Sequence, residues 1–270
     1  EQDSSEMHWK DWSGQTQGWS SWPQDSEEVG DPWYIDAHDL VLEPASGKAH
    51  SFTLVLLHSC SGGPDDWLPI LHRLDVPFRS DIRFVVPCAP MRRESHSSWS
   101  GEMNSWFEYA ADGQSAKDPE QLAEQRTRLL ATLERERSRL PGGDARRIVL
   151  GGLSQGVALA VDAALHSPFA IGGVLCLRGA VLTSSVPDAL AAKRSSNPLE
   201  VFAYHGERDR QCPIDEARES YEALKAAGAR LRFIADASLA HSCARGRQQL
   251  CGGELKEVSK FLKDVWGSMC

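Results

Sequence analysis

The segment that most constrains the fold is RIVLGGLSQGVALA, residues 147–160. An apolar run typical of a buried strand leads into Gly152-x-Ser154-x-Gly156, and an apolar helical pattern follows at once. Small residues two places before and after the serine let a strand and a helix approach closely around a sharp turn. A bare motif of this kind also occurs in ordinary turns, but its flanking strand and helix favour a serine nucleophile raised above a sheet.

Apolar runs and helical periods alternate along the chain after residue 36. The runs predict strands at Asp39–Leu42, Phe52–His58, Ile82–Pro87, Arg147–Gly152, Gly172–Leu177, Val201–His205 and Arg230–Ala235. The helical periods predict helices at Pro119–Leu140, Val157–His166, Asp215–Ala227 and Glu254–Trp266. Several of the runs are continuously apolar, as expected for strands covered on both faces. The alternation predicts an α/β fold with a mostly parallel central sheet and helices on both faces.

The negative charge of the chain is concentrated at its start. The chain of 270 residues carries 38 acids and 29 bases, a net charge of −9. Residues 1–32 hold eight of those acids and one base (−7), which leaves 30 acids and 28 bases (−2) for the rest. Because residues 1–32 have almost no aliphatic side chains, we expect a disordered acidic tail followed by one domain, residues 33–270.

Tryptophans are unusually frequent in the predicted tail. Trp9-x-x-Trp12 recurs ten residues later as Trp19-x-x-Trp22. The pair of motifs is either a short linear motif for a protein partner or low-complexity drift, and both interpretations stay open.

The nearly neutral domain argues against a nucleic acid partner, because phosphate binding needs a basic face.

The sequence predicts a cytoplasmic protein without metal or cofactor. Its most apolar window, residues 156–177, is interrupted by Asp162, His166 and Pro168, so it fits a helix and a strand better than a membrane span. No basic amphipathic helix is apparent, so we expect at most transient membrane contact. The first 30 residues lack the pattern of a secretion signal, although a targeting or lipid signal before Glu1 stays open.

The seven cysteines suggest reduced thiols rather than a disulfide framework. Their number is odd, and the chain is long enough to fold without disulfides. No cysteine pair or cysteine–histidine cluster has the spacing of metal ligands. Residues 151–156 also lack the spacing of a dinucleotide-binding loop, so no cofactor is expected.

A nucleophilic serine needs a base and an acid that orients the base. In proteins with this turn both follow the serine, the acid first. Two histidines, His205 and His241, compete as the base, and we favour His241 because it lies in the loop after the last predicted strand. Asp209, shortly after His205, is the favoured acid. The acids weighed against it are Glu207, Asp215 and Asp236.

Two backbone N–H groups are expected to face the oxyanion that forms when the serine attacks a carbonyl. One belongs to Gln155, directly after the serine, and the other lies near Cys60 in the loop after an early central strand. We expect His58 to organise this loop through hydrogen bonds. The Cys60 thiol is a poor candidate nucleophile, since no turn positions it and no local base accompanies it.

Taken together, these motifs resemble the acyl-protein thioesterase and carboxylesterase family of α/β-hydrolases. The resemblance extends from about residue 54 to residue 266 and preserves the order and spacing of the motifs. The matching blocks are Leu56-Leu57-His58, Pro87-Cys-Ala-Pro90, Met103-Asn-Ser-Trp106-Phe107, residues 147–156, His205-Gly206-x-x-Asp209 and His241-Ser242.

The resemblance implies an α/β-hydrolase fold with Ser154 as nucleophile, Asp209 as orienting acid and His241 as base. It also implies an oxyanion hole made by the backbone of Cys60 and Gln155. The implied substrates are thioesters on S-palmitoylated proteins, or small carboxylic and lysophospholipid esters.

The resemblance further implies that Trp106 lines the acyl pocket, although a core aromatic is the open alternative. The chain departs from the family at Ser59, where glycine is usual, so a side chain there perturbs the oxyanion loop if the backbone needs positive φ.

Two other functions remain as alternatives. One is a small-ester or dienelactone-type hydrolase, and the other is a catalytically silent hydrolase-fold protein that binds a partner through its Trp-rich tail.

Overall fold

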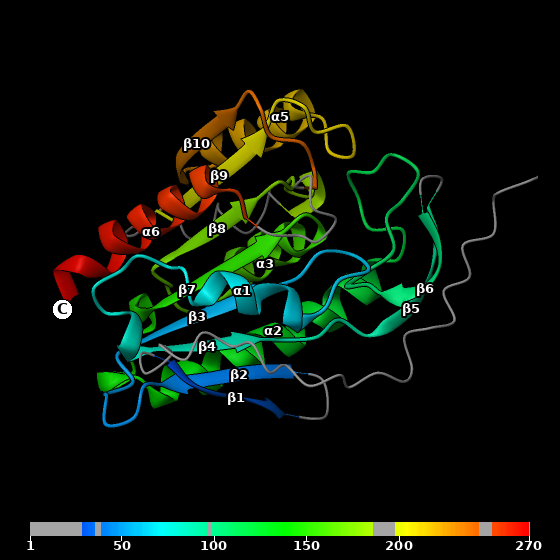
Figure 1. The fold of residues 1–270 in the computed structure, drawn as a ribbon. Coiled ribbons are helices and arrows are strands. Elements are labelled where there is room, and N and C mark those ends of the chain that lie inside the picture. Colours follow the sequence, from blue (N-terminus) through cyan, green and yellow to red (C-terminus); the bar gives the residue numbers. More distant parts are fainter. Residues whose placement is uncertain (1–28, 36–38, 97–98, 186–197, 243–249, 270) are drawn as a thin grey trace, which may run out of the picture.

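The computed structural model describes residues 29–35, 39–96, 99–185, 198–242 and 250–269. Its centre is an eight-stranded sheet in the order β1-β2-β4-β3-β7-β8-β9-β10 (Figure 1). The strands are β1 (Val29–Ile35), β2 (Asp39–Pro44), β3 (Phe52–Leu57), β4 (Ile82–Val86), β7 (Ile148–Leu153), β8 (Gly173–Leu177), β9 (Glu200–Gly206) and β10 (Arg230–Asp236). β2 pairs antiparallel with β1 and β4, whereas the six strands from β4 to β10 are parallel.

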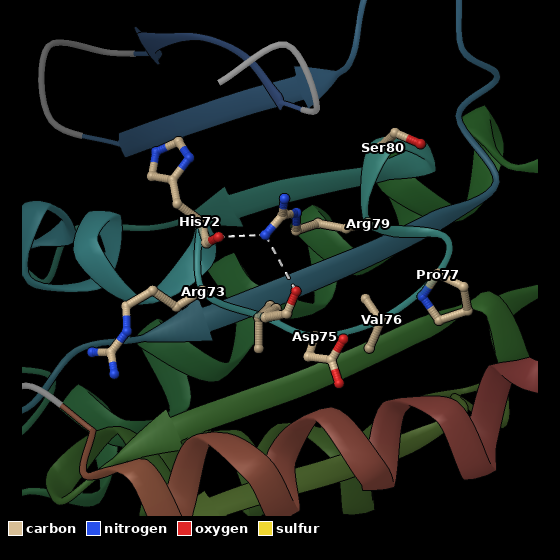
Figure 2. Close-up of a pocket in the computed structure, with 8 residues that line it drawn as sticks. His72, Arg73, Asp75, Val76, Pro77, Arg79 and Ser80 are labelled. Atoms are coloured by element: carbon tan, nitrogen blue, oxygen red, sulfur yellow. Dashed lines mark hydrogen bonds between the residues drawn. The ribbon is translucent and has the colours of Figure 1, made fainter. Parts of the chain in front are cut away.

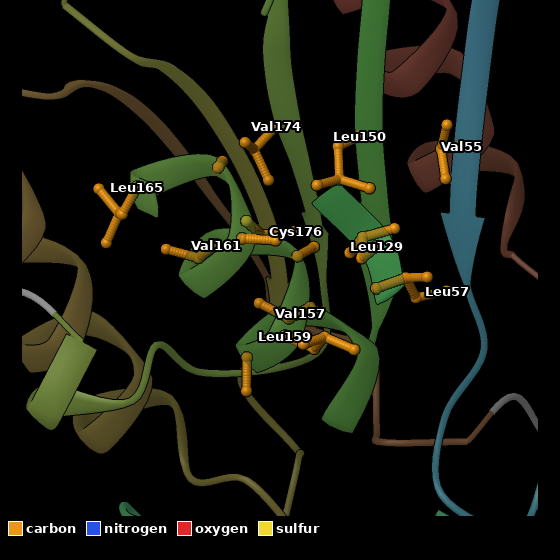
Figure 3. Close-up of a cluster of buried hydrophobic side chains, with 14 of the residues drawn as sticks. Val55, Leu57, Leu129, Leu150, Val157, Leu159, Val161, Leu165, Val174 and Cys176 are labelled. Carbon is orange, nitrogen blue, oxygen red and sulfur yellow. The ribbon is translucent and has the colours of Figure 1, made fainter. Parts of the chain in front are cut away.

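Helices cover both faces of the sheet. The strands direct apolar side chains to both faces, so each face is covered. The helices are α1 (Leu68–Leu71), α2 (Pro119–Arg139), α3 (Gln155–His166), α5 (Ile214–Ala226) and α6 (Gly252–Trp266). One buried apolar cluster joins α2, α3 and α5 to one face, and a second joins α1 and α6 to the other. Figure 3 shows Val157 and Val161 of α3 in one buried cluster with Leu150 and Val174 of the sheet. This arrangement confirms the predicted α/β-hydrolase fold.

The start and end of α2 follow from local chemistry. The Asp118 side chain accepts a hydrogen bond from the N–H of Glu120, and Pro119 occupies the first turn, where its missing N–H does no harm. The helix ends at Arg139, just before Pro141. The predicted helix 119–140 is therefore correct to within one residue.

The sequence did not predict every element. All seven predicted strands and four predicted helices are present, with ends shifted by one or two residues. The antiparallel hairpin of β5 (Met91–His96) and β6 (Trp99–Asn104), the strand β1 and the short helix α1 were not predicted. The predicted tail lies mostly outside the described residues, and β1 contains its last four residues, so the boundary at residue 33 stays a prediction.

The apolar window at residues 156–177 forms most of α3 and then β8, as predicted. No helix in the described part of the chain is both long and apolar enough to cross a membrane.

In the turn between β7 and α3, the backbone at Gly152 and Gly156 packs directly against neighbouring backbone. A Cβ atom on Gly156 would lie 2.5 Å from the carbonyl oxygen of Leu57 and 2.8 Å from that of His58. A Cβ atom on Gly152 would lie 2.2 Å from the carbonyl carbon of Gly156. A side chain at either position would clash with backbone. This is the physical reason why glycine stands two residues before and two residues after Ser154.

We expect Gly156→Ala to lower the free energy of unfolding by about 3 kcal/mol, because the new methyl group meets rigid backbone. Urea denaturation monitored by circular dichroism measures the change. Gly267→Ala is the matched control, since nothing lies within 4 Å of its Cβ position. The control is expected to stay within about 0.5 kcal/mol of the wild type. Equal stability of all three proteins would contradict the packing argument.

Candidate active site

Ser154 occupies a sharp turn at the carboxyl end of β7. Its φ of 55° and ψ of −119° are unusual for a residue with a side chain, and α3 begins at the next residue. The Ser154 N–H donates to the carbonyl of Leu177 at 2.9 Å, which ties the turn to the neighbouring strand β8. Backbone strain of this kind persists only where the surrounding structure enforces it, and it is concentrated at functional sites.

Ser154, His241 and Asp209 form one hydrogen-bonded series. His241 Nε2 lies 2.9 Å from Ser154 Oγ, and His241 Nδ1 lies 2.8 Å from Asp209 Oδ2. The three residues follow the strands β7, β9 and β10, so the parallel sheet brings them to one edge, at the carboxyl ends of its strands. With its proton on Nδ1, His241 donates to Asp209 and accepts from the serine hydroxyl.

Asp209 is held as a carboxylate acceptor. Its Oδ1 accepts the N–H groups of Gln211 at 3.0 Å and Cys212 at 2.8 Å, which leaves Oδ2 for His241. Burial disfavours the charged carboxylate, but the hydrogen bond and charge of His241 and the Cys212 N–H outweigh it. The pKa of Asp209 therefore lies below its ordinary value.

His205, the competing histidine, lies against the turn that carries Asp209. Its Nε2 is 2.8 Å from the carbonyl oxygen of Cys212 and 3.5 Å from Asp209 Oδ2. Burial lowers its pKa, so the ring stays neutral and shapes the turn that carries Asp209.

The N–H groups of Cys60 and Gln155 are available at the positions predicted for oxyanion donors. Gln155 is the first residue of α3, where N–H groups have no acceptor within the helix. The structure shows no hydrogen-bond acceptor for either N–H among the residues it describes. Asn104 fixes the loop around Cys60, because its carbonyl accepts the Ser61 N–H at 2.8 Å and its side chain donates to the Gly62 carbonyl at 2.9 Å.

The loop is further braced by His58, as the sequence predicted. Its Nε2 accepts the N–H of Ala89 at 2.9 Å, and its Nδ1 donates to the carbonyl of Ser59 at 2.8 Å. Burial lowers the pKa of His58 to about 4, which keeps the ring neutral. Burial also raises the pKa of the Cys60 thiol to about 12, so this thiol is a poor nucleophile.

Ser59 does not have the strained backbone that its replacement of a usual glycine suggested. The non-glycine residues with positive φ in the described part of the chain are Ser61, Ser154 and Arg178. Ser59 therefore has a backbone that any residue adopts, and its hydroxyl donates to the carbonyl of Cys60 at 3.1 Å.

Trp106 lies in the core, which corresponds to the alternative interpretation of this residue. It is 2% exposed, and its indole N–H donates to the carbonyl of His58 at 2.8 Å. Its backbone N–H donates to the side chain of Gln155 at 3.0 Å. Trp106 thus braces the segments of His58 and Gln155, and it is absent from the lining of the cavity at Ser154 described next.

A cavity of about 110 Å³ lies at Ser154 and His241. Its remaining lining combines small, polar and apolar residues. These are Tyr109, Gly113, Gln114, Gly179, Ala180, Val181, Leu182, Gln211, Cys212, Glu216 and Ser220. The space beside the hydroxyl is therefore short and only partly apolar.

A larger cavity of about 360 Å³ is lined by residues 72–77, Arg79 and Ser80, which precede β4 (Figure 2). Because β4 runs parallel to β7, this cavity lies toward the amino ends of the parallel strands, whereas Ser154 lies at their carboxyl ends. The Arg79 guanidinium donates to the carbonyls of His72 and Leu74 and so stabilises the loop itself. Ser154, Asp209 and His241 do not line this cavity.

The arrangement at Ser154 supports acyl transfer, because His241 lies against the hydroxyl and Asp209 against His241. A family model described as phospholipase/carboxylesterase matches residues 39–265. The chain belongs to the phospholipase/carboxylesterase family. As a member of this family it is a serine hydrolase of carboxylic esters.

Two relatives are similar to this chain over most of their own length. Acyl-protein thioesterase 1 of Mycosarcoma maydis is 27% identical over 245 residues, covering 84% of this chain and 96% of the relative. Acyl-protein thioesterase 1 homolog 1 of Dictyostelium discoideum is 26% identical, covering 71% and 84%.

Solved structures show the same fold. SOBER1 of Arabidopsis thaliana matches with a TM-score of 0.67 and 24% identity, covering 80% of this chain and 99% of that one. Acyl-protein thioesterase 2 of Zea mays matches with a TM-score of 0.67 and 23% identity, covering 84% and 98%.

The sequence did not reveal the role of Asn104, although the block containing it contributed to the resemblance. A single polar residue at the end of an unpredicted strand carries no periodic signal, and its contacts are with a loop distant in the chain.

We expect the buried His58 to make the protein sensitive to acid. The unfolded chain takes up a proton near the ordinary pKa of 6.5, whereas the folded chain does so only near pH 4. Stability therefore falls as the pH drops from 6.5 to 4, by about 3 kcal/mol for this residue. Urea denaturation at pH 7 and pH 4.5 measures it, and in His58→Gln the loss between the two pH values should be smaller by about that amount. An identical loss in both proteins would show that His58 does not cause it.

Proposed function

We propose that the chain is an acyl-protein thioesterase or a closely related carboxylesterase that works through an acyl-enzyme on Ser154. The observation that carries the proposal is the hydrogen-bonded series from Ser154 through His241 to Asp209. The names of the Mycosarcoma and Dictyostelium relatives support the thioester class of substrate.

In the proposed reaction, His241 Nε2 takes the proton of Ser154 Oγ, and the oxygen attacks the acyl carbonyl carbon. The resulting oxyanion faces the N–H groups of Cys60 and Gln155, each worth about 3 kcal/mol in comparable enzymes. Collapse of the tetrahedral species breaks the C–S or C–O bond, and the leaving thiol or alcohol receives the proton from His241. A water then attacks the acyl-enzyme with His241 again as base, which releases the acid and restores Ser154.

A catalytically silent binding protein is disfavoured by the same geometry. Such a protein has no need to hold Ser154 at a φ of 55° with the His241 ring 2.9 Å from its hydroxyl. A protein partner for residues 1–32, transient membrane contact and a cytoplasmic location stay predictions.

The size of the cavity favours a small acyl group, which keeps the small-ester hydrolase as a second candidate function. Pockets that enclose drug-sized ligands measure roughly 300–1,000 Å³, whereas the cavity at Ser154 measures about 110 Å³. Its lining includes the polar side chains of Gln114, Gln211 and Glu216 rather than a continuous apolar wall.

We expect a fluorophosphonate probe to label the wild-type chain at Ser154 and to leave Ser154→Ala unlabelled. Asp209→Asn should label more slowly and lose about 10⁴-fold in kcat, because an amide no longer holds His241 in the required tautomer. Asp215→Asn, at an exposed acid on the first turn of α5, is the matched control and should retain full activity. Full labelling of Ser154→Ala at the same site would refute the assignment.

Acyl length is tested with a series of p-nitrophenyl and thioester substrates from two to sixteen carbons. For the second candidate, the cavity volume predicts that kcat/KM is highest for the shortest chains and at least tenfold lower for palmitoyl. A maximum at palmitoyl would show that the acyl chain occupies a different path, and it would favour a depalmitoylating enzyme.

A further inference from the structure

We propose that Arg178, together with Glu254, positions His241 for proton transfer, an inference that rests on the function proposed above. Neither side chain touches Ser154, so both would be positioning residues. The pair acts through the backbone of the histidine rather than through its ring.

Arg178 occupies a strained and completely buried position. It follows the carboxyl end of β8 with a φ of 49°, in the left-handed region that arginine rarely adopts, and it is 0% exposed. Its N–H donates to the carbonyl of Tyr204 on β9 at 2.9 Å. The other strained non-glycine residues, Ser61 and Ser154, also follow carboxyl ends of central strands, so this strain is concentrated around the site.

One guanidinium joins the loop of His241 to the start of α6. Arg178 Nη1 donates to the carbonyl of His241 at 2.8 Å, while Nε lies 2.9 Å from Glu254 Oε1. Both side chains of this ion pair are fully buried. The other carboxylate oxygen of Glu254 accepts the N–H of Cys251 at 2.8 Å, so Glu254 is itself fixed to the first turn of α6.

The neighbours of Arg178 contact the serine. The Leu177 carbonyl accepts the Ser154 N–H at 2.9 Å, and a Cβ atom on Gly179 would lie 2.4 Å from the carbonyl oxygen of Ser154. Three consecutive residues therefore hold Ser154 on one side and His241 on the other. Fixing both partners of a proton transfer to the same short segment sets the distance between them.

Stability alone does not explain a buried pair of this kind. A buried ion pair is often no more stabilising than apolar residues of the same volume, because both charges lose their hydration. The planar guanidinium lets Nη1 donate to the His241 carbonyl while Nε lies against the Glu254 carboxylate, whereas a lysine offers a single charged atom for both places. The identity of Arg178 is thus explained by the geometry that it imposes on His241.

The test compares Arg178→Lys, Arg178→Met and the double variant Arg178→Met/Glu254→Gln with the wild type. The double variant removes both buried charges but keeps an oxygen for the Cys251 N–H. Arg83→Lys is the matched control, because Arg83 and Glu136 form another buried pair at 2.9 Å, 1% exposed on each side, near the opposite end of the sheet. The measurements are kcat and KM on a short p-nitrophenyl ester, the rate of fluorophosphonate labelling, and Tm.

We expect both Arg178 single variants to lose between about tenfold and a hundredfold in kcat and in labelling rate, with KM within about threefold of the wild type. The double variant should regain Tm relative to Arg178→Met but remain slow. Arg83→Lys should lose Tm while its kcat stays within about twofold.

Three results would overturn the inference: wild-type kcat in folded Arg178→Lys, recovery of kcat in the double variant, or an equal loss of kcat in Arg83→Lys. Absence of labelling at Ser154 in the wild-type chain would instead refute the proposed function, and this inference with it.

Discussion

The contact between the β7–α3 turn and the backbone of β3 is the constraint on which the site depends. Gly156 lets the first turn of α3 approach the carbonyls of Leu57 and His58 without a side chain between them. That approach forces Ser154 into its left-handed conformation and places the Gln155 N–H and the loop after β3 on the same side of the sheet. The proposed nucleophile and the proposed oxyanion donors thus depend on one close approach of two backbones.

The parallel part of the sheet was predictable from the sequence because strands buried on both faces are continuously apolar. The β5–β6 hairpin was not, since its segment MRRESH is polar and charged and pairs only with a strand of similar composition. Hairpins that lie outside the apolar layers leave no hydrophobic period to detect. The same reasoning accounts for α1, whose four residues are too few to show a helical period.

Residues of the site that follow strand ends were predictable, because a parallel sheet brings those ends together. Ser154, Asp209 and His241 are such residues, and the structure places them within hydrogen-bond distance. For Trp106 the sequence left the acyl pocket and the core both open, because an aromatic side chain has the same sequence signature in either place, and the side chain is buried in the core. Arg178 was overlooked, since a charge at the end of an apolar strand is interpretable only when its buried partner is known.

β10 carries the loop of His241, and it is the last strand of the sheet, paired on one side only with β9. Its side chains are mostly half-exposed, unlike the fully buried β3 and β7. Edge elements with little buried surface open locally at a lower free energy than the centre of a domain. The proposed base therefore follows a half-exposed edge strand, whereas the proposed nucleophile follows a strand that is buried throughout. Local opening of β10 is therefore expected to separate His241 from Ser154 at a lower free energy than opening of the central strands requires.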